Sequence, residues 1–400
     1  MLKKNIRLLY LLCFLQGMVF YGPIATLYRQ ARGVTIGQIT LIESINLGLS
    51  LLLEIPWGVV ADKIGYKRTF VFCTWLYFAS KLVFWQAEGF GWFLAERLML
   101  SVVIAGLSGV DSTILYLSCG RPGTPGALDS QKAFGVWDSM GTAGLLFASV
   151  VFSVWVKENY SLAAFLTVLS YGAAALLALG IEDVKAPAPS DEETTEGFGN
   201  VWKEIFQNRS LILFLAAGAL LGETHQTITV FLNQLQYEAC GMTSEVIGLV
   251  YIAATLLGMA GQYSSEATHK LGLPRALFGF SGCAAAACLV LAFTRSAGAS
   301  VGAILLLRLS HSLLLPLRMQ IQNQSIQTKN RATALSVQTI FTDGIAVGTN
   351  LAFGQLAERT LPGAFLFGAG ISGLSVVLLA VWYRAHCRKS RAAQSSAGQL

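Results

Sequence analysis

The sequence predicts an all-α integral membrane protein with twelve transmembrane helices in two pseudo-symmetric six-helix bundles. Hydrophobic residues make up 54% of the chain and charged residues only 12%, with a mean hydropathy of +0.58. An ordinary soluble domain carries about a quarter of its residues as charges. At about 20 apolar residues per span, a chain of 400 residues has room for about twelve helices joined by short loops.

Six apolar segments of spanning length lie in each half of the chain. In the first half they are 7–28, 36–57, 69–87, 91–118, 132–156 and 161–181. In the second half they are 210–235, 245–264, 275–294, 299–321, 332–356 and 363–384. The interval 182–209 contains APAPSDEETTEGFGN, which is rich in proline and acid and is too polar to span. We therefore expect bundles at 1–181 and 210–400, joined by a flexible cytoplasmic linker; a cytoplasmic tail ends the second bundle.

The lysines and arginines predict the orientation of the chain. Most of the 28 fall at segment ends that share one side if both termini are inside. By the positive-inside rule, both termini are cytoplasmic and the protein is a multi-pass protein of the cytoplasmic (inner) membrane. The outer loops then hold only Arg29, Arg32, Lys157, Arg295 and Arg359. Because the cations sit at helix ends, the net charge of +6 does not indicate nucleic-acid binding.

The two halves repeat short patterns at a constant separation. Gly33-Val34-Thr35 after the first segment parallels Gly241-Met242-Thr243 after the seventh. The run HKLGLPR at 269–275 parallels the loop at 58–68, with His269 in place of the acid at Asp62. Repeats of about 200 residues fit two related six-helix halves.

The most informative stretch is GVVADKIGYKR at 58–68, between the second and third segments. Its marked positions are Gly58, Asp62, Gly65, Lys67 and Arg68. Glycine permits a tight turn, and the cations keep the loop in the cytoplasm. The run resembles the G-x-x-x-D-x-x-G-x-[RK]-[RK] loop of the major facilitator superfamily of transporters. The preceding Glu54-Ile55-Pro56 resembles a bacterial branch of that family.

The resemblance implies a conformational latch. In the family, the acid of this loop faces the start of the eleventh helix, so Asp62 would lie near Ala332 and Thr333. That acid would break its contact when the inner face opens. One feature departs from the family's proton-coupled drug antiporters, because the fifth segment lacks their typical Gly-Pro pair.

Charged side chains inside the predicted spans are the candidate substrate or coupling residues. Such groups are costly in a bilayer, so they face protein or water and usually have a task. The candidates are Glu43, Arg97, Asp111, Glu223, His225, Arg308, His311 and Asp343.

These candidates admit more than one role. Arg97 and Arg308 either recognise an anion or gate the path, or they pair structurally with Glu43 or Glu223. Either Glu223 or Asp343 can carry a coupling proton, because burial favours the neutral form of a carboxyl. His311 is a proton partner or a satisfied core histidine. We expect structural or interdomain roles for Lys81 and Asp138.

Together these features predict a monomeric secondary transporter that works by alternating access. Its partners are a small-molecule substrate, protons and the lipid bilayer. The first hypothesis is proton-coupled export, by antiport, of an amphipathic or anionic compound; the alternative is proton-coupled uptake of a small nutrient. No P-loop, HExxH or GxSxG motif occurs, which argues against ATP as the energy source and against an enzyme. The scattered cysteines form no CxxC pattern, so we predict no cofactor and no metal site.

Overall fold

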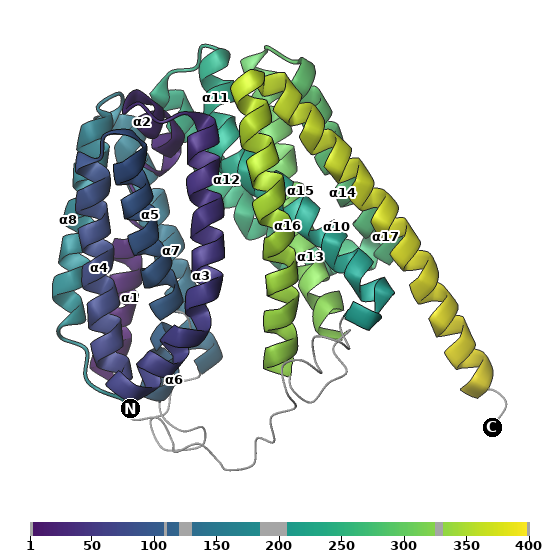
Figure 1. Ribbon diagram of the computed structural model, residues 1–400, viewed down its shortest axis with the longest axis horizontal. Helices are drawn as coiled ribbons and strands as arrows, with labels where there is room; N and C mark the ends of the chain where they lie inside the picture. Colours follow the sequence, from purple (N-terminus) through teal and green to yellow (C-terminus); the bar gives the residue numbers. More distant parts are fainter. Residues whose placement is uncertain (1–2, 108–109, 120–129, 185–205, 325–330, 398–400) are drawn as a thin grey trace. The chain divides into compact units, whose positions relative to one another are not determined.

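The structure, a computed structural model, describes residues 3–107, 110–119, 130–184, 206–324 and 331–397, and these ranges are predominantly helical (Figure 1). No strand occurs in these ranges. The chain forms two compact units. The first is Met1–Ser190 with Met242–Thr255, and the second is Asp191–Gly241 with Leu256–Leu400.

The helices of the first unit follow the predicted segments. They are α1 (Lys3–Gly17), η1 (Gly22–Ile24), α2 (Ala25–Ala31), α3 (Ile36–Ile64), α4 (Tyr66–Gln86), α5 (Gly89–Leu107), α6 (Val110–Cys119), α7 (Ser130–Val151), η2 (Phe152–Val156) and α8 (Tyr160–Ala178). The first segment breaks after Gly17, and Pro23 then occupies an early position of η1. Proline fits a first helical turn, so the helix restarts directly as α2.

The second unit is built in the same way. Its helices are α10 (Arg209–Thr227), η3 (Ile228–Leu232), α11 (Asn233–Ala239), the end of α12 (Ser244–Gly258), η4 (Met259–Tyr263), α13 (Ser264–Leu271), α14 (Leu273–Phe293), α15 (Ala297–Gln324), α16 (Arg331–Arg359) and α17 (Leu361–Ala397). Within this unit α17 packs against α10 and α14, and its last turns extend past these neighbours (Figure 1).

Nine helical runs among the described residues are long and apolar enough to cross a membrane. The runs outside this set are α3, α4 and α16. Each of these carries charged or strongly polar residues along its length, such as Glu43 on α3, Lys81 on α4 and Asp343 on α16. All twelve predicted segments coincide with helices, so the helical fold is confirmed; that all twelve span the membrane remains a prediction.

The backbone supports the predicted repeat. Gly33 and Gly241 have φ angles of 82° and 73°, and Gly65 and Gly272 have φ angles of 96° and 81°. Positive φ is accessible to glycine at little cost, which explains glycine at these turns. The turn at 58–68 is tighter than we predicted. Helix α3 continues to Ile64 and α4 begins at Tyr66, so Gly65 alone separates them.

Close helix packing in the first unit depends on small residues. A Cβ atom added at Gly17 on α1 would overlap the backbone carbonyl of Gly141 on α7, and one added at Gly144 would overlap that of Phe14. Glycine at such crossings lets two helix backbones approach closely. This close approach packs α1 directly against α7.

Candidate functional site

Two of the predicted site residues meet in the first unit. Arg97 on α5 donates a hydrogen bond through Nη2 to Glu43 Oε1 on α3. Arg29 on α2 reaches the same carboxylate, with its Nη1 at 3.9 Å from Glu43 Oε1. One carboxylate therefore serves two guanidinium groups. One turn away from Arg97, Ser101 Oγ donates to Asn46 Oδ1 at 2.7 Å and continues the polar contact between α5 and α3.

The position of Arg29 differs from the sequence prediction. We expected it in an outer loop, but its residue is only 5% exposed and lies in a helix. Pro23 lets the first segment restart as a short helix, and Glu43 supplies a counter-charge for a buried arginine. The Arg29 guanidinium also lies 5.6 Å from the centre of the Phe84 ring.

A second buried ion pair lies in the same unit. Lys81 Nζ on α4 is 3.4 Å from Glu96 Oε1 on α5 and donates to the Tyr21 hydroxyl at 3.0 Å. The ammonium group also lies 5.1–5.8 Å from the ring centres of Tyr21, Tyr77 and Tyr171. Lys81 and Glu96 are 4% and 1% exposed. This enclosure agrees with the structural role expected for Lys81, whereas sequence reasoning missed Glu96.

In the second unit, Glu223 on α10 is more enclosed than Asp343, the other predicted coupling acid of this unit. It is 7% exposed, and Thr227 Oγ1 donates to its Oε1 at 2.7 Å. Asn350 Oδ1 on α16 lies 3.5 Å from the same hydroxyl oxygen. Asp343, also on α16, is near enough to interact electrostatically with Glu223. Among the described residues, no Lys, Arg or His nitrogen lies within 4.0 Å of the Glu223 carboxylate.

The other polar face of α10 meets α15 in a basic cluster. The rings of His225 and His311 stack with centroids 3.8 Å apart and an interplanar angle of 7°. Arg308 Nη1 lies 3.3 Å from His225 Nε2. Gly258 makes room for this arginine, because a Cβ atom there would lie 2.7 Å from Arg308 Nη2. The structure thus brings together three residues that the sequence singled out separately.

Sequence reasoning also missed Arg318, two to three helical turns beyond Arg308 on α15. Its guanidinium lies against α10 at Gly218, where a Cβ atom would be 2.6 Å from Nη2. Its Nη1 atom is buried without a hydrogen-bond partner among the described residues. Gly218 and Arg318 are far apart in the sequence, so no pattern of neighbouring residues predicts their contact. Only the packed structure reveals it.

Other predicted residues lie elsewhere along the helices. Asp111 begins α6, and its Oδ1 accepts from the Ser112 amide at 2.6 Å. Lys67 and Arg68 lie in the first turn of α4. The side chains of Gly58 and Asp62 lie outside the described part, so the latch remains a prediction. Within the described residues no group of three His, Cys, Asp or Glu side chains is arranged to hold a metal ion.

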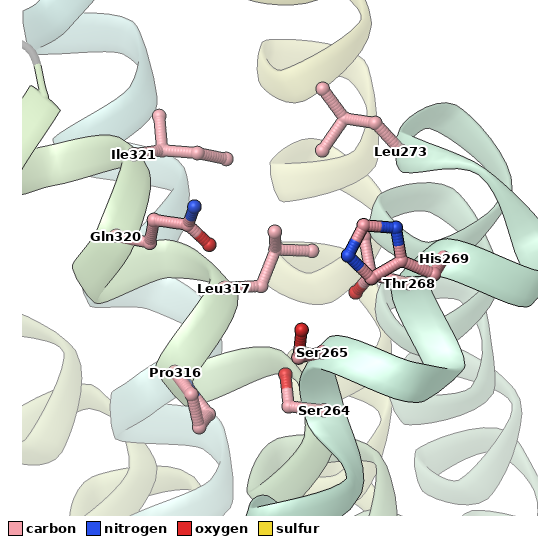
Figure 2. A pocket seen from close by; sticks show the side chains of 9 residues that line it. All are labelled: Ser264, Ser265, Thr268, His269, Leu273, Pro316, Leu317, Gln320 and Ile321. Atoms are coloured by element: carbon pink, nitrogen blue, oxygen red, sulfur yellow. The ribbon is translucent and has the colours of Figure 1, made fainter.

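A pocket of about 260 Å³ lies in the second unit and is lined by residues of α13, α14 and α15. In Figure 2, Gln320 and Ile321 on α15 face His269 and Leu273 across it. Pro316 lies inside α15 beside the pocket, and Ser264 Oγ donates to the Leu313 carbonyl at 2.5 Å. The lining contains no Asp, Glu, Lys or Arg, so the pocket lacks the charge of the candidate site.

The model of the Major Facilitator Superfamily matches residues 8–349. The chain belongs to the Major Facilitator Superfamily. This confirms the family predicted from the loop at 58–68 and identifies the protein as a membrane transporter rather than an enzyme. No curated protein matches the chain significantly in sequence.

Solved structures of this superfamily share the fold at low sequence identity. The crystal structure of the nucleoside transporter NupG is similar with a TM-score of 0.77 and 15% identity, over 95% of this chain and 99% of NupG. A bacterial homologue of the human lysosomal transporter Spinster, inward-facing and unoccupied, matches with a TM-score of 0.68 and 15% identity, over 94% of each chain. The POT family transporter PepTSo matches with a TM-score of 0.73 and 13% identity, over 96% of this chain and 98% of PepTSo. At these identities the likeness establishes the fold alone.

Proposed function

We propose that this superfamily member is a proton-coupled secondary transporter of a small anionic or amphipathic compound in the cytoplasmic membrane, with both termini inside. Transporters of this superfamily work by moving one half of the molecule against the other. Coupling to protons requires a group that binds and releases a proton during that movement. The observation that carries the proposal is the enclosed Glu223 carboxyl, held by a hydroxyl rather than by a cation.

Glu223 has the environment that a coupling acid requires. A carboxylate fixed by an arginine keeps its charge, whereas one held by Thr227 can exchange a proton when its surroundings change. Asp343 provides a second acid that interacts electrostatically with Glu223, and the charge of one carboxylate disfavours the charged form of the other. We therefore assign Glu223 the coupling role, with Asp343 as its partner.

The direction of transport has two candidates. Export by exchange with protons is the first hypothesis from the sequence. The basic cluster of Arg308, His225 and His311 supports the second, uptake by symport. A proton on Glu223 removes a negative charge two residues from His225, so an anion binds that cluster more favourably once the proton is bound. Joint binding of a proton and an anion favours symport.

Measuring proton movement in proteoliposomes tests both the coupling role of Glu223 and the choice between symport and antiport. Purified protein is reconstituted with the pH-sensitive dye pyranine inside, and small carboxylates, phosphate esters and nucleosides are added outside. Symport acidifies the lumen and antiport makes it more alkaline, whichever way the protein is inserted. We expect Glu223→Gln to abolish this proton signal while exchange of labelled substrate across the membrane continues.

A matched variant controls for the loss of any carboxylate. Glu88→Gln removes an exposed acid that pairs with Arg32 at 3.7 Å, and it should behave like the wild type. Asp343→Asn is measured in parallel. If Glu223→Gln and Asp343→Asn both move protons as the wild type does, neither acid couples transport, and this assignment is wrong.

A further inference from the structure

Among the described residues, the cations enclosed in the first unit outnumber the carboxylates that they contact. The buried Arg29 and Lys81 and the partly buried Arg97 are paired with two carboxylates, those of Glu43 and Glu96. Lys81 is paired with Glu96, one cation to one carboxylate. The excess positive charge therefore lies on the two arginines, which both contact Glu43. A buried excess charge is costly unless another group compensates it.

The same two arginines have unused hydrogen-bond donors. The Nε atoms of Arg29 and Arg97 are both buried and have no partner among the described residues. Buried donors of this kind usually have a partner, and a charged donor without one costs more than a neutral one. The Arg29 side chain is 6% exposed and that of Arg97 is 21% exposed, so Arg97 is the more accessible of the two.

We propose that Arg29 and Arg97 form an anion clamp, which takes a carboxylate or phosphate group of the transported compound. Glu43 occupies the clamp as an internal anion when no ligand is bound. A guanidinium group suits this task because its planar set of N–H donors matches the two oxygens of a carboxylate or phosphate. This inference rests on the proposed function, because it supplies the charge of the transported compound.

The neighbouring ion pair shows what a purely structural arrangement looks like in this unit. Lys81 meets one carboxylate, one hydroxyl and three aromatic rings, and it is almost completely enclosed. The arginine pair differs in two respects. It has twice as many cations as carboxylates. Its buried atoms without a partner among the described residues are the Nε donors, which an anion can satisfy, whereas in the lysine pair the corresponding atom is an acceptor, Glu96 Oε2.

Thermal unfolding in the presence of anions tests the clamp without any transport measurement. Detergent-purified protein is heated with sodium phosphate or sodium succinate, and with sodium chloride at equal ionic strength as the reference. Intrinsic tryptophan fluorescence gives the unfolding temperature, and titration of each anion gives its affinity. We expect phosphate or succinate to raise the unfolding temperature of the wild type more than chloride does. Arg97→Gln and Arg29→Gln should each lower the affinity for that anion at least about tenfold.

Glu43→Gln makes the prediction specific. Removing the internal anion should strengthen the response to the added anion, in the opposite direction to the arginine variants. Arg32→Gln is the matched control, because this arginine pairs with Glu88 outside the clamp. If a glutamine variant elutes as aggregate, Arg97→Lys and Arg29→Lys replace it; they keep the charge but lose the planar donors, and should still bind more weakly.

Two results would overturn the clamp: wild-type protein that neither anion stabilises beyond chloride, or equal stabilisation of the wild type and all clamp variants. The test also separates this inference from the proposed function. Loss of the anion response in the arginine variants supports the clamp even if the pyranine assay detects no proton movement. Conversely, the wild type could show proton-coupled flux while the arginine variants keep the same anion response as the wild type. That result would support the proposed function and refute the clamp.

Discussion

Replacing Lys81 with methionine tests whether the enclosed ion pair stabilises the first unit. Methionine keeps the apolar stem but removes the ammonium that contacts Glu96 at 3.4 Å and Tyr21 at 3.0 Å. With Glu96 only 1% exposed, its carboxylate is left buried without a counter-charge. Removing one partner of a buried pair costs about 3–5 kcal/mol. For a unit of this size, that corresponds to a fall of about 6–20 °C in the unfolding temperature.

The assay is thermal unfolding of purified protein in detergent, followed by tryptophan fluorescence at one heating rate. Lys81→Met is compared with Glu96→Gln and with the double variant. Because the double variant removes both charges and nearly conserves volume, it should recover most of the loss. The reasoning fails if Lys81→Met unfolds within about 2 °C of the wild type, since a buried pair costs more than that to break. It also fails if the double variant is no more stable than the less stable single variant.

Three further predictions concern the latch, the topology and helix packing. Asp62→Asn should leave expression largely intact but strongly reduce transport, and wild-type flux would refute the latch. Thr195→Cys, in a background without other reactive thiols, should be labelled in intact cells only by a membrane-permeant maleimide; labelling by an impermeant one from outside would reverse the orientation. Gly144→Ala should lower the unfolding temperature by several degrees, because its Cβ overlaps the Phe14 carbonyl. Gly48→Ala, where a Cβ atom meets nothing within 4 Å, should not.

Much of the fold follows from local properties of the sequence. Apolar length placed the twelve helical segments, and the glycine turns at Gly65 and Gly272 were visible as a repeated pattern. These features depend on residues that are close together in the chain. The exact end of α3 was less predictable. Polar residues such as those near Asp62 are compatible both with a continued helix and with a loop.

The clusters themselves were only partly predictable. Hydropathy and spacing identified Glu43, Arg97 and Glu223 as unusual inside a membrane segment. They did not predict that Arg29 turns inward, because that depends on the restart of α2 after Pro23 and on a carboxylate on another helix. The π-helical turns η2 and η3 were likewise not predictable from the residues that form them. Such turns shift the side chains that follow them around the helix, so they alter which residues meet.

The two units hold their buried charges in different ways, and this difference supports a division of tasks. In the first unit, the carboxylates of Glu43 and Glu96 are held by cations. In the second, Glu223 is held by a hydroxyl. A carboxylate between cations keeps its charge and suits the recognition of a charged compound, whereas one beside a hydroxyl can change its protonation. Recognition by the first unit and proton exchange by the second would then be separable by mutation. Arg97→Gln should weaken anion binding without removing proton coupling, and Glu223→Gln should remove proton coupling without weakening anion binding.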